Sequence, residues 1–504
     1  MLTTIIAALL LAAPPNVAVT RWVSPDNSRP TSRAEWLACT GTNDQWKVRT
    51  IRAARAFPER CDILVQDSIY PAIAARLDTL LADLAAESTG AALYTVTGTS
   101  AESLRGFLAA EYADGMTQAV FVGDLPVAWF QMIDDWNSNG SRDPDEGYEE
   151  FPCDLFFMDV DGVWQDTMCR LADTLDSLVP GPDGIYDQHS GNINPELAIS
   201  RLPASVLGDA ESILNAYLAR DHAYRTGNLP LPERALVYID DDWAEYAPEW
   251  SGNVGLLYPD RVTIAGPETT RCIEYRPRID SAAYQWISLC SHSWPGGHAM
   301  YYNHHVDMDW FYATEIEGIN PYASFYNLFA CSNARYVEQG FAGGCYAMLT
   351  STGLGAVGTT KTGSMLEFAD YYHGLSTGRN LGQAMSDWLY LRMADQWENW
   401  EKAWFMGMVT IGDGTLKPRN AQTAVAETPQ PPSARPFLTP TIARNVLVLN
   451  STLGIGCWSL SDATGRSVMP LNVGANDVSA LPSGIYFVCL NSAASRPVPV
   501  TVVH

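Results

Sequence analysis

The chain has 504 residues, of which 47% are hydrophobic, and its formal net charge is −26. A chain of this length exceeds the roughly 250–300 residues at which a single core stops growing, so two or more domains are expected. The charge argues against nucleic-acid binding, because phosphate contacts need clustered lysine and arginine. The acidic excess lies in the first 420 residues, since residues 421–504 hold three acids and four arginines.

The N-terminus begins with a short apolar block, residues 5–13, followed by Pro14 and Pro15. This pattern is typical of a secretory signal peptide, predicted here over residues 1–19, with a buried N-terminal helix as the alternative. No other segment is long enough to cross a membrane. Residues 20–60 are expected to be irregular, as either a removable pro-segment or a decoration of the main domain. The ten cysteines can form disulfides in an exported chain, but their spacing shows no zinc or CxxC motif.

From residue 61 onward, apolar runs of strand length alternate with amphipathic helical patterns. The alternation predicts an α/β fold with a mostly parallel sheet covered by helices on both faces, divided into subdomains 61–230 and 231–420. Helices are expected at residues 71–87, 103–113 and 209–224. Strands are expected at residues 61–65, 92–96, 119–123, 235–239, 286–290, 326–330 and 355–359.

An acidic insertion, residues 134–196, separates the two halves of this pattern. Its first part places oxygen ligands at positions 1, 3, 5, 7, 9 and 12 of a loop with glycine at position 6, as in the calcium loop of an EF-hand. A solvated acidic turn is the alternative. Residues 159–162 and 183–187 are weaker copies. The expected ligands of a structural calcium ion are Asp135, Asn137, Asn139, Ser141, Asp143 and Glu146.

The C-terminal part changes in composition. Residues 421–437 contain four prolines and few bulky apolar side chains, which indicates a stiff linker. Short strand-like runs separated by turn residues then follow at 445–449, 457–460, 467–471 and 484–490. They predict a small β-sandwich over residues 438–504.

Two apolar runs end in residues that can perform nucleophilic catalysis. The run at 285–290 is followed by Ser291, His292 and Ser293, and the run at 326–330 is followed by Cys331. Open α/β sheets place their sites at the carboxyl ends of strands, so a thiol and an imidazole there form a possible nucleophile and base. Taken singly, each residue is more often structural. Rivals for these two roles are Cys272, Cys290, Cys345, His298, His304 and His305.

The two strand-end turns read Leu289-Cys290-Ser291-His292-Ser293 and Ala330-Cys331-Ser332-Asn333. Together with further motifs in order along the chain, they resemble the gingipain family of cysteine peptidases, whose fold is similar to that of caspases. The first corresponds to the family's His-Gly-Ser turn, with Ser293 in place of glycine, and the second to its Ala-Cys-x-Asn turn. The resemblance covers about residues 60–417. Further matching segments are 122–126, 195–203, 353–358 and 411–416, the last with Gly414 in place of proline.

The resemblance implies specific roles. Cys331 would be the nucleophile and His292 the base, and the family orients its histidine with a carboxylate from an earlier strand end. Here that place holds Asp240, Asp241 and Asp242, of which Asp242 is preferred and Asp241 comes next. All three could instead be solvated or bind a metal. By the same analogy, the backbone N–H groups of Cys331 and Ser293 would bind the oxyanion.

The tail carries a second resemblance. Residues 460–468 and 481–488 are similar to the C-terminal sorting domain of type IX secretion cargo, although the family's terminal basic residues are absent here. The resemblance implies passage across a bacterial outer membrane, with the secretion machinery as a partner and a secreted or surface location. An ordinary β-sandwich is the alternative.

These patterns favour a secreted cysteine endopeptidase, supported by calcium, that acts on proteins or peptides. A close variant is a sortase-like transpeptidase that passes the acyl group to an amine. The alternative from another class is a surface carbohydrate-binding protein that stacks sugars on tryptophans such as Trp294 and Trp310. The preference for the residue before the cleaved bond cannot be deduced.

Overall fold

The computed structural model describes residues 17–54, 57–141, 143, 146–171, 177–392 and 397–419 of the first part of the chain. In the C-terminal part it describes residues 437–438, 442–443, 446–450, 458–462, 466–472, 474–490 and 498–502. The chain divides into two compact units, Met1–Thr423 and Ala424–His504. Each unit is described by itself.

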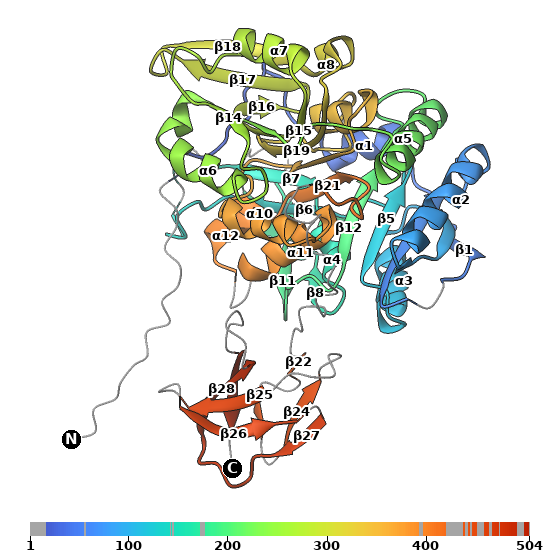
Figure 1. Ribbon diagram of the computed structural model, residues 1–504, viewed down its shortest axis with the longest axis vertical. Coiled ribbons are helices and arrows are strands. Elements are labelled where there is room, and N and C mark those ends of the chain that lie inside the picture. The colour runs from blue at the N-terminus through green and yellow to red at the C-terminus, as the bar shows by residue number, and fades with distance from the viewer. Residues whose placement is uncertain are drawn as a thin grey trace. The chain divides into compact units, whose positions relative to one another are not determined.

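The first unit is built on a twelve-stranded sheet flanked by helices (Figure 1). Its strand order is β1-β4-β2-β5-β12-β21-β20-β19-β15-β13-β14, with β3 paired to β2. Neighbours run parallel except for β1 with β4 and β20 with β21. This is the mostly parallel α/β sheet that the alternating pattern predicts. The bounds are β1 Lys47–Arg52, β2 Glu59–Gln66, β3 Thr89–Gly90, β4 Leu93–Thr97, β5 Gln118–Val122, β12 Ala198–Leu202, β13 Ala235–Ile239, β14 Arg261–Ile264, β15 Tyr284–Cys290, β19 Ala323–Phe329, β20 Gly355–Thr359 and β21 Met408–Gly412.

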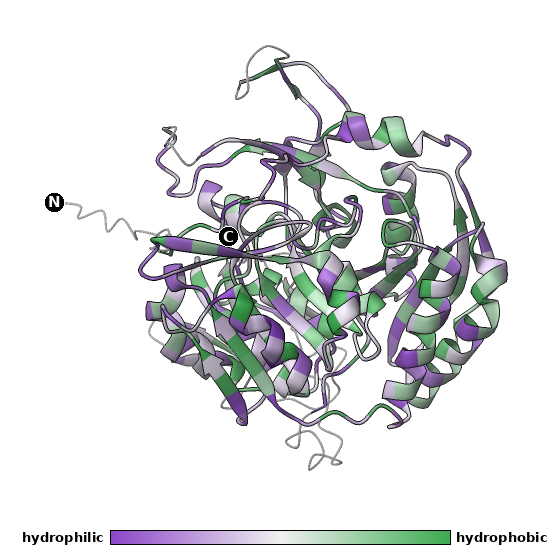
Figure 2. Cartoon of the chain, turned by 90° about the horizontal axis from the view of Figure 1, so that it is seen from above, coloured by the Kyte–Doolittle hydropathy of each residue, from purple (hydrophilic) through white to green (hydrophobic). Residues whose placement is uncertain are grey.

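The central strands are buried along their whole length. Every residue of β13, β15, β19, β20 and β21 is buried, as expected for parallel strands covered on both faces. Figure 2 shows hydrophobic residues concentrated on the inner strands, whereas the outer helices mix both kinds. The strands predicted at residues 235–239, 286–290, 326–330 and 355–359 are confirmed as β13, β15, β19 and β20, whereas β21 was not predicted.

Helices α2, α3 and α5 each bury one largely apolar face. Helix α2 starts next to Pro71, which suits the first turn because proline lacks the N–H that a helix start leaves unpaired, and it buries Ile73, Leu77 and Leu84. The predicted helices at 71–87, 103–113 and 209–224 correspond to α2, α3 and α5. The bounds are α1 Arg33–Thr40, α2 Tyr70–Ala86, α3 Ala101–Ala113, α4 Leu155–Met158, α5 Ala210–Arg225, α6 Ala247–Val254, α7 Cys272–Ser281, α8 Ala313–Ile319, α9 Ala342–Gly344, α10 Phe368–Ser376, α11 Leu381–Arg392 and α12 Asn399–Phe405, with a 3-10 helix η1 Asp241–Tyr246 and a π-helical turn η2 Cys345–Leu349.

Two regions are more regular than expected. Residues 20–60 are not irregular throughout, because they contain α1, capped by Ser32, and β1, which pairs with β4 along the sheet edge. A three-stranded sheet, β16-β17-β18, follows β15 where the sequence suggested a turn. The insertion carries short pairs of strands. The bounds are β6 Trp129–Ile133, β7 Tyr148–Pro152, β8 Val163–Gln165, β9 Met168–Arg170, β10 Leu178–Pro180, β11 Gln188–Ser190, β16 His292–Trp294, β17 Gly297–Tyr302 and β18 Asp307–Tyr312.

The second unit contains two sheets, β22-β24-β27 and β23-β29-β28-β25-β26. Buried apolar residues from both sheets, among them Leu447, Leu460 and Val488, form one cluster. The predicted strands are found here, while the sandwich and its role in sorting stay predictions. Residues of the predicted linker and the signal peptide lie largely outside the described residues. The bounds are β22 Phe437–Leu438, β23 Ile442–Ala443, β24 Val446–Asn450, β25 Trp458–Asp462, β26 Ser467–Leu471, β27 Gly474–Asp477, β28 Gly484–Leu490 and β29 Val498–Val502.

Among the described residues, no helix combines the length and the apolar character that crossing a bilayer requires.

Candidate active site

The two strands that carry the predicted nucleophile and base are parallel neighbours in the sheet. In their register Cys290 of β15 lies opposite Phe329 of β19. His292 and Cys331 each come two residues later, so both lie at the same edge of the sheet. The Ser293 hydroxyl donates a hydrogen bond of 2.6 Å to the Cys331 carbonyl and ties the two turns together.

Cys331 lies in a turn with unusual backbone geometry. The next residue, Ser332, has φ 56°, a left-handed conformation that non-glycine residues seldom adopt and that often occurs at functional sites. The Ser332 N–H donates to the Lys361 carbonyl at 2.9 Å, which holds the turn. The Cys331 side chain is fully buried, and its Sγ donates to Thr362 Oγ1 at 3.4 Å. Burial, together with the nearby Glu149 carboxylate, raises the pKa of the thiol to about 12, so it is protonated in this state.

Both ring nitrogens of His292 have partners. Nε2 bonds to Asp242 Oδ2, and Nδ1 accepts a hydrogen bond of 3.0 Å from the backbone N–H of Arg21. An accepting Nδ1 requires the tautomer that carries its proton on Nε2 and donates it to Asp242. Burial lowers the pKa of His292, while the bond to Asp242 acts in the opposite direction.

The three consecutive aspartates have three different roles. Asp242 holds His292; although burial raises the pKa of Asp242, the hydrogen bond to His292 lowers it overall. Asp240 is fully buried, caps η1 by accepting from the Asp242 N–H at 3.0 Å, and accepts from the Tyr301 N–H at 2.6 Å. Asp241 accepts from the His305 N–H at 3.0 Å. Of the three acids, the one that contacts the predicted base is Asp242.

A segment from the start of the described chain crosses this site. The Arg21 carbonyl accepts from the Ser293 N–H at 3.3 Å, and the Val23 N–H donates to the Ser293 carbonyl at 2.9 Å, so the segment runs parallel to β16. The buried Thr20 hydroxyl donates to the Gly363 carbonyl and accepts from the Gly363 N–H, both at 3.0 Å. Arg21 thus uses its main chain to occupy both His292 Nδ1 and an N–H group predicted to bind the oxyanion.

A buried charge cluster lies behind the nucleophile. The fully buried Lys361 ammonium pairs with Asp134 and with Glu149, each at 2.9 Å. Burial raises the pKa of Asp134 to about 8. Burial opposes the charge on Lys361, but the two carboxylates outweigh it and raise the lysine pKa. Glu149 also accepts from Thr362 Oγ1 at 2.5 Å, which links this cluster to the Cys331 thiol through Thr362.

The rival cysteines and histidines have other surroundings. Burial raises the pKa of Cys272, Cys290 and Cys345. In the part of the chain that is described, none of these three is bonded to a histidine side chain, and the same holds for Cys331, whose Sγ contacts Ser332 and Thr362. His298 is fully buried, stacks on Phe311 and Tyr346, and has its pKa lowered to about 3 by burial. His304 is exposed. His305 pairs with Asp242 through Nδ1 at 2.5 Å. It therefore contacts the acid that holds the predicted base.

The predicted calcium loop is closed by its own hydrogen bonds. Asp135 accepts from the backbone N–H groups of Asn139 and Gly140, and Glu146 accepts from those of Trp136 and Asp143. The Asn137 and Asn139 amides both reach Asp143 Oδ2, at 2.6 and 3.2 Å, so three predicted ligands converge. An all-oxygen set at these positions fits a calcium ion. The Ser141 backbone N–H donates to Asn139 Oδ1 at 2.6 Å. Residues 142, 144 and 145 lie outside the described residues.

The two weaker copies of the loop differ. Asp159, Asp161 and Glu196 bring carboxylate oxygens within 4.8 Å of one another, and burial raises the pKa of Glu196 to about 7. Asp183 and Asp187 instead accept hydrogen bonds from Gln131 and Thr167 of neighbouring strands and linkers. Around the first copy, three carboxylates lie close enough together to share a ligand. In the second copy, hydrogen bonds within the protein already occupy the carboxylates.

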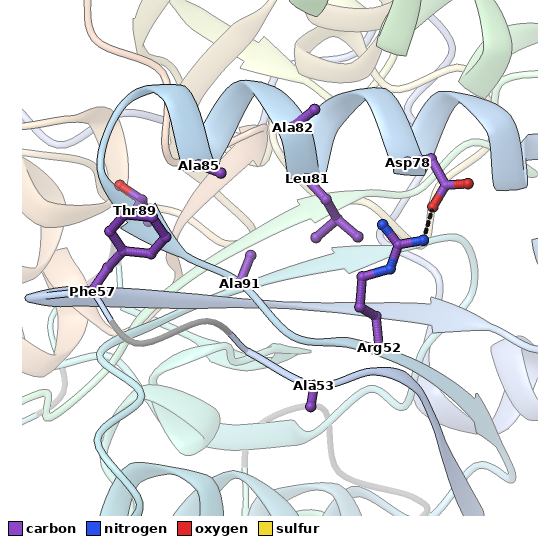
Figure 3. A pocket seen from close by; sticks show the side chains of 9 residues that line it. All are labelled: Arg52, Ala53, Phe57, Asp78, Leu81, Ala82, Ala85, Thr89 and Ala91. Carbon is purple, nitrogen blue, oxygen red and sulfur yellow. Dashed lines mark ion pairs between the residues drawn. The ribbon is translucent and has the colours of Figure 1, made fainter.

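Two further features are the tryptophan predicted to stack on sugars and a surface pocket. Trp294 is 8% exposed and packs edge-on against Trp310 at 5.5 Å, which leaves little of its face for a sugar. A shallow pocket lies between β1 and α2, where Arg52 and Asp78 form an ion pair of 2.7 Å (Figure 3). None of the predicted site residues lines it.

Sequence reasoning missed Arg21, Lys361, Glu149 and Thr362. Lys361, Thr362 and Gly363 follow β20 as His292 follows β15 and Cys331 follows β19, so the strand-end argument could have found them. A lysine two residues after a buried strand was the available signal. No local pattern marks Arg21, which lies 271 residues from His292 in the chain.

The sequence matches no protein-family model and no curated protein. Among solved structures, the chain is similar to the complex of the pro- and mature domains of RgpB from Porphyromonas gingivalis, with a TM-score of 0.47 and 12% identity. The match covers 88% of this chain and 99% of that one. A likeness at this level carries no argument about chemistry, which the residues of the site must support.

Proposed function

We propose that the chain is a gingipain-like cysteine endopeptidase in which Cys331 is the nucleophile, His292 the acid and base, and Asp242 the group that orients the histidine. The observation that carries this proposal is the pair of bonds on His292. One nitrogen is fixed by a carboxylate, and the other meets a peptide N–H beside the Cys331 turn. A histidine held in this way has one defined tautomer. Its Nδ1 becomes available for proton transfer once the Arg21 main chain leaves.

The reaction would be acyl transfer. His292 Nδ1 takes the thiol proton as Cys331 Sγ attacks the substrate carbonyl, and it later gives that proton to the leaving amine. A water then hydrolyses the thioester by the reverse sequence of proton transfers. Asp242 keeps Nε2–H in place and stabilises the imidazolium that forms. The oxyanion would be bound by the Ser293 and Cys331 N–H groups; within the described part of the chain, the Cys331 N–H makes no hydrogen bond.

The state described here would be a latent one. The main chain of Arg21 takes the proton-transfer nitrogen and the Ser293 N–H, and Thr20 fills the space beside Gly363. A substrate peptide needs those same groups. Residues 20–60 were interpreted as either a removable pro-segment or a decoration of the main domain. These contacts support the pro-segment for the part that contains Thr20–Val23.

The proposal is tested by profiling a peptide library with the parent chain and with Cys331→Ala, after the chain has been allowed to process itself or has been cut as described in the Discussion. Cleavage by the parent and none by Cys331→Ala is expected. Equal cleavage by both would refute the assignment of the nucleophile. Adding a surface-sugar amine separates hydrolysis from transpeptidation, because a transpeptidase forms conjugates. A glycan array that binds the chain while every peptide stays uncut would favour the carbohydrate-binding alternative.

Calcium would have a structural part, bound by Asp135, Asn137, Asn139, Ser141, Asp143 and Glu146. An excess of calcium about 100-fold above its dissociation constant should stabilise the parent by about 2.7 kcal/mol, seen as a rise in Tm over the chelated sample. Glu146→Gln should remove most of this rise, because the bidentate carboxylate is lost. Magnesium serves as the control ion. A calcium-dependent rise of the same size in Glu146→Gln would contradict the site.

Export and surface location are also part of the proposal. The apolar block at residues 5–13 supports a signal peptide, and the strand motifs at residues 460–468 and 481–488 support a type IX sorting domain as the partner of the secretion machinery. Proteins or peptides outside the cell would then be the substrates.

A further inference from the structure

The hairpin between β17 and β18 has a strained tip that touches the aspartate run. Its connecting residues Asn303, His304 and His305 are all left-handed, with φ of 55°, 56° and 63°. Three successive non-glycine residues in this conformation are rare, and such strain persists only where the surroundings hold it. The next residue, Val306, is 74% exposed, so apolar burial does not hold the tip.

Two hydrogen bonds and an ion-pair contact to the three aspartates hold the tip instead. Tyr301 N–H donates to Asp240 at 2.6 Å and His305 N–H donates to Asp241 at 3.0 Å. The His305 side chain reaches Asp242 Oδ1 through Nδ1 at 2.5 Å. The left-handed turn therefore directs both the backbone and the ring of His305 at η1.

The contact with Asp242 gives His305 a place in the site. A carboxylate with one bonded oxygen can still rotate about its Cβ–Cγ bond, whereas Asp242 has Oδ2 on His292 and Oδ1 on His305. Second partners of this kind orient a ligating or catalytic group and are sensitive to substitution. Charged and titratable groups that face His305 are Asp241 and Asp242 of η1 and His292 of β16. The charge of Arg21 acts on Asp242 and His292.

Resting on the proposed function, we propose that His305 is a positioning residue for the reaction: its Nδ1–H locks the Asp242 carboxylate in the orientation that holds His292. Asp242 thus lies between two imidazoles, one that reacts and one that fixes it. His305 does not touch the reacting atoms and acts only through Asp242.

Two variants separate orientation from charge. His305→Gly suits the left-handed backbone but removes the donor, whereas His305→Asn suits the same backbone and keeps an N–H donor at the δ position without a ring charge. In the full chain, under conditions in which the parent cleaves peptide, His305→Gly should lower kcat about tenfold with little change in KM, by analogy with losses of such supporting bonds. His305→Asn should restore most of kcat. His304→Gly is the matched control, since it changes a left-handed neighbour on the same tip that is exposed, and its kcat should equal that of the parent.

A second readout does not depend on activity. In a Cys331→Ala background, NMR titration of the labelled histidines gives the pKa of His292 directly. A charge on His305 lowers that pKa, so His305→Asn, which removes the charge and keeps the donor, should raise it, while His304→Gly should leave it unchanged. His305→Gly also loosens Asp242, whose bond raises the His292 pKa, so the pKa should rise less in His305→Gly than in His305→Asn. If His305→Asn recovers kcat while the His292 pKa stays raised, His305 acts by positioning Asp242 through its donor and not through its charge.

An unchanged kcat in His305→Gly, in a parent whose activity Cys331→Ala abolishes, would overturn the positioning role and leave the proposed function intact. If the parent cleaves nothing, the proposed function fails. In that case an unmoved His292 pKa in both His305 variants would overturn the coupling as well, and a raised pKa would support it.

Discussion

Cutting the chain in the exposed turn at residues 25–27 is expected to raise the rate at which iodoacetamide labels Cys331 by about 100-fold or more. In the described state the thiol is fully buried and its pKa is about 12 rather than the ordinary 9, because burial opposes the thiolate. Returning the thiol to its ordinary pKa would increase the thiolate fraction near pH 8 by roughly a thousandfold, and the thiolate is the form that reacts.

The cut is expected to release the segment because few contacts hold it. Residues between the predicted signal peptide and the turn are joined to the site by hydrogen bonds of Thr20, Arg21 and Val23. In the intact chain these bonds form within one molecule, and a cut removes that advantage of effective concentration. Peptide cleavage should appear together with thiol reactivity.

The experiment has an internal standard. A site for a peptidase of unrelated specificity replaces Pro25–Asn27, and mass spectrometry follows each labelled cysteine. Cys39 is exposed and should react at the same rate before and after the cut. The latent state would be disproved if Cys331 reacted as fast as Cys39 in the uncut chain, or if the cut left its labelling rate unchanged.

The sheet was largely predictable because its central strands are buried on both faces. Mostly apolar runs of strand length, such as those of β15 and β19, are typical of parallel strands buried on both faces. That His292 and Cys331 lie at the same edge of the sheet follows from two parallel strands that end in register, and that could be argued from residue order alone.

Contacts between distant segments could not be predicted. The pairing of Arg21 with His292 and of Lys361 with Asp134 joins parts of the chain 271 and 227 residues apart, and no periodicity encodes such partners. Nor could the pattern decide among Asp240, Asp241 and Asp242. Their directions depend on the 3-10 turn that Asp240 caps, which points one acid at a backbone amide of β17, one at the hairpin tip and one at the imidazole.

Asp242→Asn is expected to lower kcat by about 10³–10⁴-fold, as the loss of the orienting carboxylate does in serine-type triads. The amide is nearly isosteric, so the loss would come from charge and tautomer rather than from packing. Asp242 raises the pKa of His292 against the effect of burial. Without the carboxylate the His292 pKa should fall further, and the imidazolium that must form during proton transfer becomes less stable.

Asp241→Asn is the matched control for this change. It removes a carboxylate from the neighbouring residue of η1, whose described bond is to the His305 N–H rather than to His292. Its kcat should stay far closer to that of the parent, and its His292 pKa should move less than in Asp242→Asn. A larger loss in Asp241→Asn than in Asp242→Asn would mean that another acid orients the histidine in the active form. Because the two variants carry the same change in net charge, a difference between them isolates the direct contact with His292 from the general field of the aspartate run.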